Sequence, residues 1–281
     1  MSTNRDNIPN SWSDVLKDNP FLIFGILNVT PDSFSDGGKF ENENDINNQI
    51  TTLKNDGANV IDIGAESTRL GSEEVVSSQE ILRLEETFSI VKNLSNDQTL
   101  FSIDTRHAQT AQEAMANRFQ VINDVSACRF DEKMREVMAS TGSLVVLMHS
   151  RSTPKDMTNF ANYKNVLDEV CSELEQQINY VTDAGVDVGK IMVDPGIGFA
   201  KSPKDGIKLI ENIDKFKSRL GLPVLVGVSR KTIISYMISG DPKSVPFEER
   251  DELTGDMSRI LREAGVDAVR VHNVAQTIKS L

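Results

Sequence analysis

Residues 191–201, with the sequence IMVDPGIGFAK, place a carboxylate at the end of a short apolar segment. The apolar run is too short for a helix and is interrupted by Pro195, so it predicts a buried parallel strand that ends at Asp194. Side chains alternate along a strand, so Met192 and Asp194 share one face. A carboxylate in this place needs hydrogen-bond donors, which either a bound ligand or the N–H groups of an Asx turn could supply. This segment alone does not distinguish the two.

Seven further apolar segments of the same kind predict a total of eight strands. They cover residues 21–28, 59–64, 100–104, 121–125, 144–149, 191–194, 224–229 and 268–272. Seven of these strands carry a hydrogen-bonding side chain near the carboxyl end: Asn28, Asp104, Asn123, His149, Asp194, Ser229 and, on the last strand, Arg270 and His272. Any one of them could be a loop cap or a satisfied core group. A mixture of amides, acids and bases at so many strand ends instead indicates a ligand site.

Two acids and an amide in this set are suited to a flat heterocycle. Asp104, Asn123 and Asp194 offer the acceptors and donors that amino and ring N–H groups require. A carboxylate pairs especially well with an aminopyrimidine-like edge, which presents two parallel donors.

Positive charge gathers after the last two strands. Ser229 ends the seventh strand, Arg230 and Lys231 follow it, and Arg270 and His272 lie on the eighth. Barrel proteins commonly hold phosphate after these strands. Lys231 could bind an anion, bond to a heterocycle or be a plain surface charge; its place directly after an apolar strand makes the last reading the least favoured.

Amphipathic helices separate the predicted strands. The clearest covers residues 203–220, with Ser202 as N-cap and Pro203 in the first turn, and another covers 166–184. Five glycines are expected to end helices in the left-handed C′ conformation: Gly57, Gly142, Gly185, Gly221 and Gly265. Residues 1–19 read as a polar, loosely held lead-in with one helical turn near 12–16, and the last helix, 275–281, is short.

Eight strands alternating with helices predict a single (β/α)₈ TIM barrel over residues 20–281, in the α/β class. A doubly wound open sheet is the alternative. It is disfavoured because no Gly-rich dinucleotide loop follows the first strand. Barrel active sites form at the carboxyl ends of the strands, where the polar side chains are.

Composition limits the partners. The net charge of −12 argues against a nucleic-acid partner, because phosphate backbones require a basic surface. No apolar stretch reaches membrane-spanning length and the two cysteines do not pair as in a disulfide or zinc motif, so we expect a cytoplasmic protein without a membrane partner. No HExxH or GxSxG motif occurs, which disfavours a transition metal and hydrolase chemistry; a hard cation such as Mg²⁺, shared with a phosphate, remains open.

Seven blocks of sequence, in order along nearly the whole chain, resemble dihydropteroate synthases. They are ILNVTPDSFSDGG at 26–38, DIGAESTR at 62–69, SIDT at 102–105, IND at 122–124, DPGIGF at 194–199, SRK at 229–231 and RVH at 270–272. The first block is long and specific. The resemblance implies a transferase that joins 6-hydroxymethyl-7,8-dihydropterin diphosphate to 4-aminobenzoate, releasing pyrophosphate and giving 7,8-dihydropteroate for folate biosynthesis.

The same resemblance assigns roles to residues and partners. It implies that Asp104, Asn123, Asp194 and Lys231 hold the pterin, with Asp104, Asp194 and Lys231 catalytic; that Thr68, Arg270 and His272 grip the diphosphate; that Phe34, Arg69 and Ser229 lie around the aminobenzoate; and that Asn28 contacts a Mg²⁺ cofactor on the diphosphate. It also implies a homodimer.

The chain departs from the usual family pattern at several positions. Leu70 replaces a Pro, Ala200 a Gly, Thr232 a Ser and Asn273 an Asp, and the block at 148–152 reads MHSRS. Leu70 and Thr232 fall toward the aminobenzoate side, so we expect altered sulfonamide sensitivity with catalysis retained. A pterin-dependent methyltransferase would not need the SRK and RVH cations, and a catalytically silent pterin-binding paralogue is the other alternative.

Overall fold

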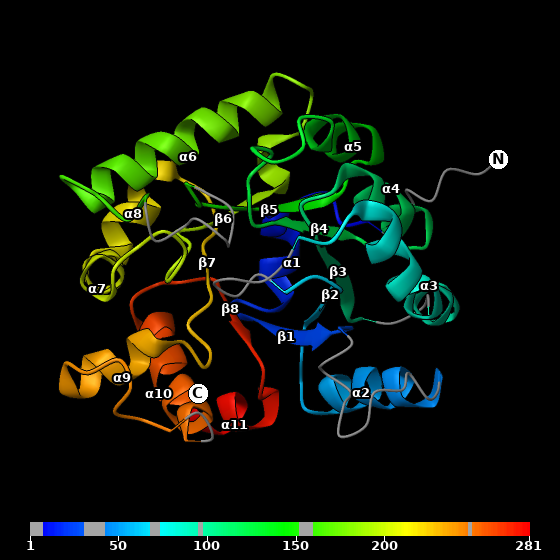
Figure 1. The fold of residues 1–281 in the computed structure, drawn as a ribbon. Coiled ribbons are helices and arrows are strands. Elements are labelled where there is room, and N and C mark those ends of the chain that lie inside the picture. The colour runs from blue at the N-terminus through cyan, green and yellow to red at the C-terminus, as the bar shows by residue number, and fades with distance from the viewer. Residues whose placement is uncertain (1–7, 31–42, 68–73, 95–97, 152–159, 247–248) are drawn as a thin grey trace.

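The structure, a computed structural model of the chain, describes residues 8–30, 43–67, 74–94, 98–151, 160–246 and 249–281. Strands occupy the centre and helices surround them (Figure 1). The strands are β1 (Leu22–Asn28), β2 (Val60–Gly64), β3 (Leu100–Asp104), β4 (Val121–Asp124), β5 (Leu144–Met148), β6 (Ile191–Asp194), β7 (Leu225–Val226) and β8 (Ala268–Val271). The helices are α1 (Trp12–Asp18), α2 (Glu43–Asn55), α3 (Ser77–Asn93), α4 (Ala108–Ala116), α5 (Met134–Thr141), α6 (Val166–Thr182), α7 (Pro203–Glu211), α8 (Ile213–Leu220), α9 (Thr232–Ser239), α10 (Arg250–Glu263) and α11 (Val274–Ser280).

The parallel strands close into a barrel. Their order is β6-β5-β4-β3-β2-β1-β8-β7, and a parallel bridge between Val193 and Val224 joins the two ends of this series. An open sheet would leave β6 and β7 at opposite edges, so the predicted (β/α)₈ barrel is confirmed. The seventh strand is shorter than predicted, because the chain turns after Val226 and the N–H of Lys231 bonds the carbonyl oxygen of Val228 (3.0 Å).

Side-chain alternation divides the core in two. One cluster fills the barrel interior and includes Met192, Val146 and Phe24. The other lies between strands and helices and includes Ile191 and Val193. Met192 and Asp194 therefore share the interior face, as the strand periodicity predicts.

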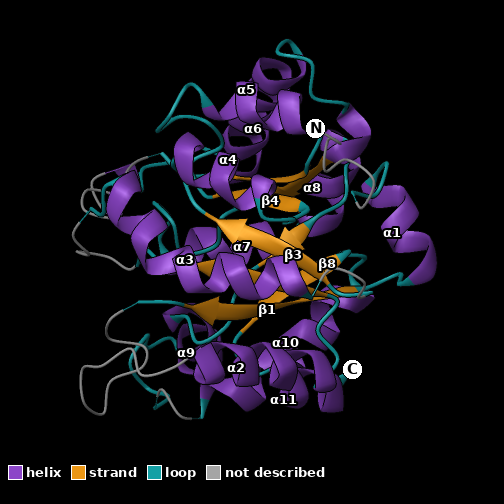
Figure 2. Ribbon diagram, turned by 90° about the vertical axis from the view of Figure 1, so that its right-hand side faces the viewer, coloured by secondary structure: helices purple, strands orange, loops and turns teal. Residues whose placement is uncertain are grey.

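The segment before the barrel is not a loose lead-in over residues 11–18. Trp12 of α1 is completely buried in the interior cluster, and its indole N–H donates to the carbonyl oxygen of Val145 (3.1 Å). Figure 2 shows α1 at the end of the barrel opposite the arrowhead of β1. A large aromatic side chain thus plugs the amino-terminal end of the barrel, which a local reading of this polar segment did not predict.

The predicted helix over 203–220 is two helices. Its start is correct, because Ser202 and Asp205 form a capping box with Pro203 in the first turn. The helix breaks at Asn212, whose amide group donates back to the carbonyl oxygen of Lys208 (2.9 Å). Asn side chains compete with helical hydrogen bonds in this way, so the break has a local cause.

The five predicted C′ glycines all adopt positive φ: Gly57, Gly142, Gly185, Gly221 and Gly265. None of the helices within the described residues is long and apolar enough to cross a membrane.

Candidate active site

Three polar side chains and one glycine form a row across four neighbouring strands at their carboxyl ends. Asn28 pairs in register with Gly64, Gly64 with Asp104, and Asp104 with Asn123. All four face the barrel interior, because each stands an even number of residues from an interior apolar side chain of its strand. The structure therefore brings the predicted amide–acid row together.

Asp194 ends β6 on the same interior face. It is 5% exposed, and its Oδ1 accepts the N–H of Gly196 (2.7 Å). The Asx turn considered from the sequence is therefore present, but it uses only one carboxylate oxygen. Burial raises the pKa of this carboxyl, and the positive charge of Lys231 opposes that shift.

Lys231 points into the site and is not a surface charge. Its Nζ donates to the carbonyl oxygen of Ile197 (2.6 Å) and lies 4.7 Å from the centre of the Phe199 ring. Burial lowers the pKa of Lys231 to about 8, while the charge of Asp194 opposes the change. The amine can thus pair with Asp194 or donate to a neutral ligand.

The second strand also contributes a polar side chain, Asp62, which the sequence analysis did not predict as a site residue. Its side chain is fully buried; Oδ2 accepts the Asn123 amide (3.0 Å), and Oδ1 has no hydrogen-bond partner. Asp62 lies two residues after Val60 of the interior cluster and two before Gly64, so strand alternation was a signal that could have found it.

Arg270 of β8 joins two of these carboxylates across the barrel. Its Nε donates to Asp62 Oδ2 (2.5 Å) and its Nη2 donates to Asp104 Oδ2 (2.6 Å). Burial raises the pKa of Asp104 to about 7; Arg270 lowers it and the negative charge of Asp62 raises it further. The predicted anion-binding arginine therefore contacts the predicted heterocycle-binding acid directly.

Ser229 and His272 form a second contact at this end. The backbone N–H of His272 donates to Ser229 Oγ (3.2 Å), and Ser229 Oγ lies 3.0 Å from His272 Nδ1. If the hydroxyl donates to Nδ1, the other ring nitrogen carries the proton and can donate to an anion. Ser229, predicted to lie near the aminobenzoate, and His272, predicted to grip the diphosphate, are thus neighbours. Phe34, Thr68, Arg69 and Leu70 lie outside the described residues.

His149 does not join the mouth of the barrel, contrary to the sequence reading. Leu144 and Val146 face the interior, so alternation turns His149 outward, where its Nε2 lies 3.1 Å from Glu173 of α6. The ring is buried behind β5 and β6. One residue of strand register separates the two faces, and the predicted end of this strand was one residue too long.

Three departures from the family pattern have a structural setting. Ala200 has φ of 46°, the left-handed conformation that glycine adopts without strain. Asn273 caps α11 by accepting the N–H of Gln276 (2.9 Å), a role that an aspartate would also fill. Thr232 is exposed at the start of α9.

The fit of a metal ion rests on Asn28. Within the described residues, no group of three or more His, Cys, Asp or Glu side chains is placed to hold a metal. Asn28 is half-buried at the end of β1 and offers one carbonyl oxygen beside the polar row. A Mg²⁺ that takes its other ligands from phosphate and water fits this donor, because hard cations prefer oxygen ligands.

Comparisons with known proteins give the family context. Residues 24–272 match the family described as pterin binding enzyme. The dihydropteroate synthase of Bacillus subtilis strain 168 is 38% identical over 91% of this chain and 84% of its own length.

Solved structures of two dihydropteroate synthases share the fold. That from Xanthomonas albilineans, with 4-aminobenzoic acid, has a TM-score of 0.82 at 32% identity and covers 92% of this chain and 90% of its own. That from Anaplasma phagocytophilum, with bound 6-hydroxymethylpterin-monophosphate, has a TM-score of 0.82 at 32% identity and covers 92% and 96%.

Proposed function

The chain belongs to the family of pterin-binding enzymes, and we propose that it acts as a dihydropteroate synthase. It condenses 6-hydroxymethyl-7,8-dihydropterin diphosphate with 4-aminobenzoate to give 7,8-dihydropteroate and pyrophosphate. The observation that carries the proposal is the pairing of an acid–amide row with half-buried cations in one barrel mouth. The row suits an aminopyrimidine edge, and the cations suit a diphosphate.

The pterin lies against Asp104, Asn123, Asp194 and Lys231 in this proposal. Asp104 and Asn123 are register neighbours, and Asp194 keeps Oδ2 and the second lone pair of Oδ1 for paired N–H donors. Lys231 can donate to a ring nitrogen or carbonyl while it balances the charge of Asp194. Buried polar groups at such a site give specificity, because a ligand without matching groups leaves them unpaired.

The diphosphate lies against Arg270 and His272, with Thr68 as a third contact. The two carboxylates take Nε and one Nη2 hydrogen of Arg270, so its remaining guanidinium N–H groups can donate to phosphate oxygens. The 4-aminobenzoate lies among Phe34, Arg69 and Ser229. Asn28 would hold a Mg²⁺, which would supply charge stabilisation to the leaving group.

The reaction is a substitution at the exocyclic methylene of the pterin. The C–O bond to the diphosphate breaks, its electron pair leaves with pyrophosphate, and the aminobenzoate nitrogen forms the new C–N bond and loses a proton. Arg270 and His272 stabilise the charge that develops on the departing oxygens. The amine needs position more than a strong base, so the residues around it act by holding it in line. No covalent enzyme intermediate is required.

Product formation from the two substrates, with and without Mg²⁺, tests the proposal. We expect dihydropteroate from the wild type, at least a hundredfold loss in Asp194→Asn, and no loss in the control Asp183→Asn, which changes an exposed carboxylate at the end of α6. Pterin binding without product in the wild type would instead identify a silent paralogue. Product formed equally well after metal removal would overturn the role of Mg²⁺ alone.

We propose a cytoplasmic location and a homodimer as part of this function. Both cysteines, Cys128 and Cys171, are buried free thiols, as is usual in a reducing compartment. Exposed apolar side chains lie on the last three helices: Met237 and Ile238 on α9, Ile260 on α10 and Ile278 on α11. Light scattering with size-exclusion chromatography checks the dimer, and a single species at the monomer mass would refute it.

A further inference from the structure

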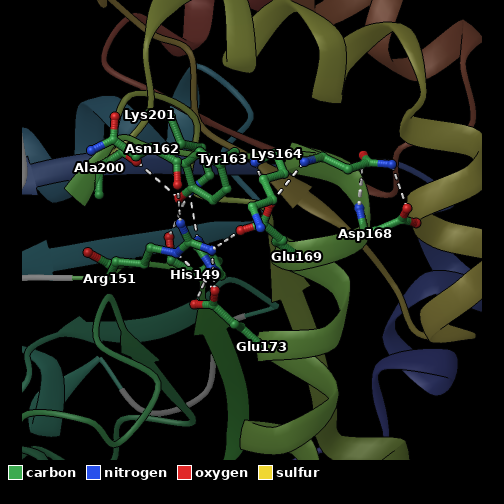
Figure 3. Close-up of polar contacts among 12 residues, drawn as sticks. His149, Arg151, Asn162, Tyr163, Lys164, Asp168, Glu169, Glu173, Ala200 and Lys201 are labelled. Carbon is green, nitrogen blue, oxygen red and sulfur yellow. Dashed lines mark hydrogen bonds and ion pairs between the residues drawn. The ribbon is translucent and has the colours of Figure 1, made fainter.

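A buried lysine behind the site contacts the loop that follows Asp194. Lys201 is 8% exposed, and its Nζ lies 2.8 Å from His149 Nδ1, 3.2 Å from the carbonyl oxygen of His149 and 3.0 Å from that of Phe199 (Figure 3). Burial lowers the pKa of Lys201 to about 7, and in the ammonium form its three N–H donors are all used by these three acceptors. Lys201 therefore has no donor left for a substrate and instead joins the end of β5 to the loop after β6.

His149, the main partner of Lys201, is in turn held by Glu173 of α6. Because Lys201 donates to Nδ1, the proton of the His149 ring is on Nε2, which donates to Glu173 (3.1 Å). Burial, with the nearby charge of Lys201, lowers the pKa of His149 to about 3, so the ring is neutral. Glu173 in turn accepts from Arg151 at 2.8 Å and 2.5 Å.

Tyr163 connects Arg151 to the loop that follows β6. The Arg151 guanidinium lies 3.9 Å from the centre of the Tyr163 ring, and the tyrosine hydroxyl donates to the carbonyl oxygen of Ala200 (3.0 Å; Figure 3). Ala200 is the residue with φ of 46°. An alanine is strained in this conformation, so the bonds at the neighbouring carbonyl groups are what keep it there.

The other side of the loop faces the site. Within Pro195–Ala200, the Gly196 N–H donates to Asp194, the Ile197 carbonyl accepts from Lys231, and the Phe199 ring lies under the same amine. A change in the loop backbone would therefore move the Ile197 carbonyl and the Phe199 ring, which orient the amine of Lys231 relative to Asp194.

We propose that Lys201 and Tyr163 are positioning residues for the pterin, acting through the Pro195–Ala200 loop. They hold the carbonyl groups of Phe199 and Ala200 so that the loop presents Lys231 beside Asp194. This inference rests on the proposed binding of the pterin by those two residues. It assigns no contact between substrate and either positioning residue.

Tyr163→Phe tests the inference with the smallest change, because it removes one hydroxyl and keeps the ring against Arg151. Tyr180→Phe is the matched control: Tyr180 lies on α6, and an arginine, Arg135, lies 4.1 Å from its ring centre. We expect the KM for the pterin diphosphate to rise about fivefold in Tyr163→Phe, which is the typical effect of one hydrogen bond. The KM for 4-aminobenzoate and the melting temperature should stay close to the wild-type values.

Ala200→Gly provides a rescue. Glycine adopts the left-handed conformation without strain, so the loop should keep its shape when the tyrosine hydroxyl is absent. The double variant Tyr163→Phe/Ala200→Gly is therefore expected to recover most of the wild-type KM. Lys201→Met, which leaves three acceptors unpaired, should raise the same KM by tenfold or more.

Calorimetric titration with 6-hydroxymethylpterin separates this inference from the proposed function. Wild type that binds no pterin would overturn the function, and the inference with it. Wild type that binds, with equal affinity in Tyr163→Phe and Tyr180→Phe, would overturn the inference alone. If Tyr163→Phe raised the KM values for the pterin diphosphate and for 4-aminobenzoate equally and lowered the melting temperature, the role of Tyr163 would be structural and the inference would be overturned. No recovery in Tyr163→Phe/Ala200→Gly would overturn it as well.

Discussion

The affinity for pterin is expected to depend on pH through two groups of the site, Asp104 and Lys231, whose pKa values are shifted by removal from water. Asp104, with a pKa of about 7, accepts from the pterin edge only as a carboxylate. Lys231, with a pKa of about 8, balances the charge of Asp194 only as an ammonium. Affinity for pterin should therefore be highest between the two pKa values. It should decrease as pH falls below the pKa of Asp104 and decrease as pH rises above the pKa of Lys231.

The size of the effect follows from these two values. Near pH 7.5 about three-quarters of Asp104 is ionised and about three-quarters of Lys231 is protonated, whereas near pH 6 only about a tenth of Asp104 is ionised. The binding-competent fraction falls about sixfold between these pH values, and apparent affinity falls by the same factor. The raised pKa of Asp194 acts in the same direction on the acid side.

Asp62→Asn provides the perturbation. Asparagine has nearly the same shape and can still accept from Arg270, but it removes the negative charge that raises the pKa of Asp104. The acid side of the affinity profile should therefore shift to lower pH, while the basic side, set by Lys231, stays in place.

Calorimetric titration of 6-hydroxymethylpterin across about pH 5.5–9 measures both profiles. Titration of the ligand itself is common to the two proteins and cancels in their difference. An affinity that is constant over this range in the wild type would refute the assignment of Asp104 and Lys231. An unchanged acid midpoint in Asp62→Asn would refute the electrostatic link between the two acids.

Three further changes have defined outcomes. Trp12→Ala should lower the free energy of unfolding by about 3–5 kcal/mol in chemical denaturation, with a smaller loss in Trp12→Phe, because the side chain is fully buried and bonded to Val145. Gly196→Ala should weaken pterin binding at least tenfold in calorimetry, since its Cβ would lie 2.0 Å from the His149 carbonyl oxygen; wild-type affinity would contradict the close approach of loop and strand. Leu70→Pro should change the ratio of the sulfonamide inhibition constant to the aminobenzoate KM, and a fixed ratio would disprove the link to this position.

Local patterns in the sequence were sufficient for the strands and for most of the row at their ends. Alternation along β6 placed Met192 and Asp194 on one face, and the same rule accounts for the interior positions that the structure gives Asp104 and Asn123. The helix start at Ser202 was equally readable. Each of these features depends on residues within one element, so a short stretch of sequence contains the information.

Only the closed barrel decided which of these side chains meet. Asp62 and Arg270 are 208 residues apart, and their contact exists because β1 lies between their two strands. The same closure buries Trp12 against β5 and places His149 against α6 behind the site. Strand periodicity fixes the face of a side chain but not its neighbour across the barrel; that neighbour depends on strand order and register, which arise from packing the whole chain around one core.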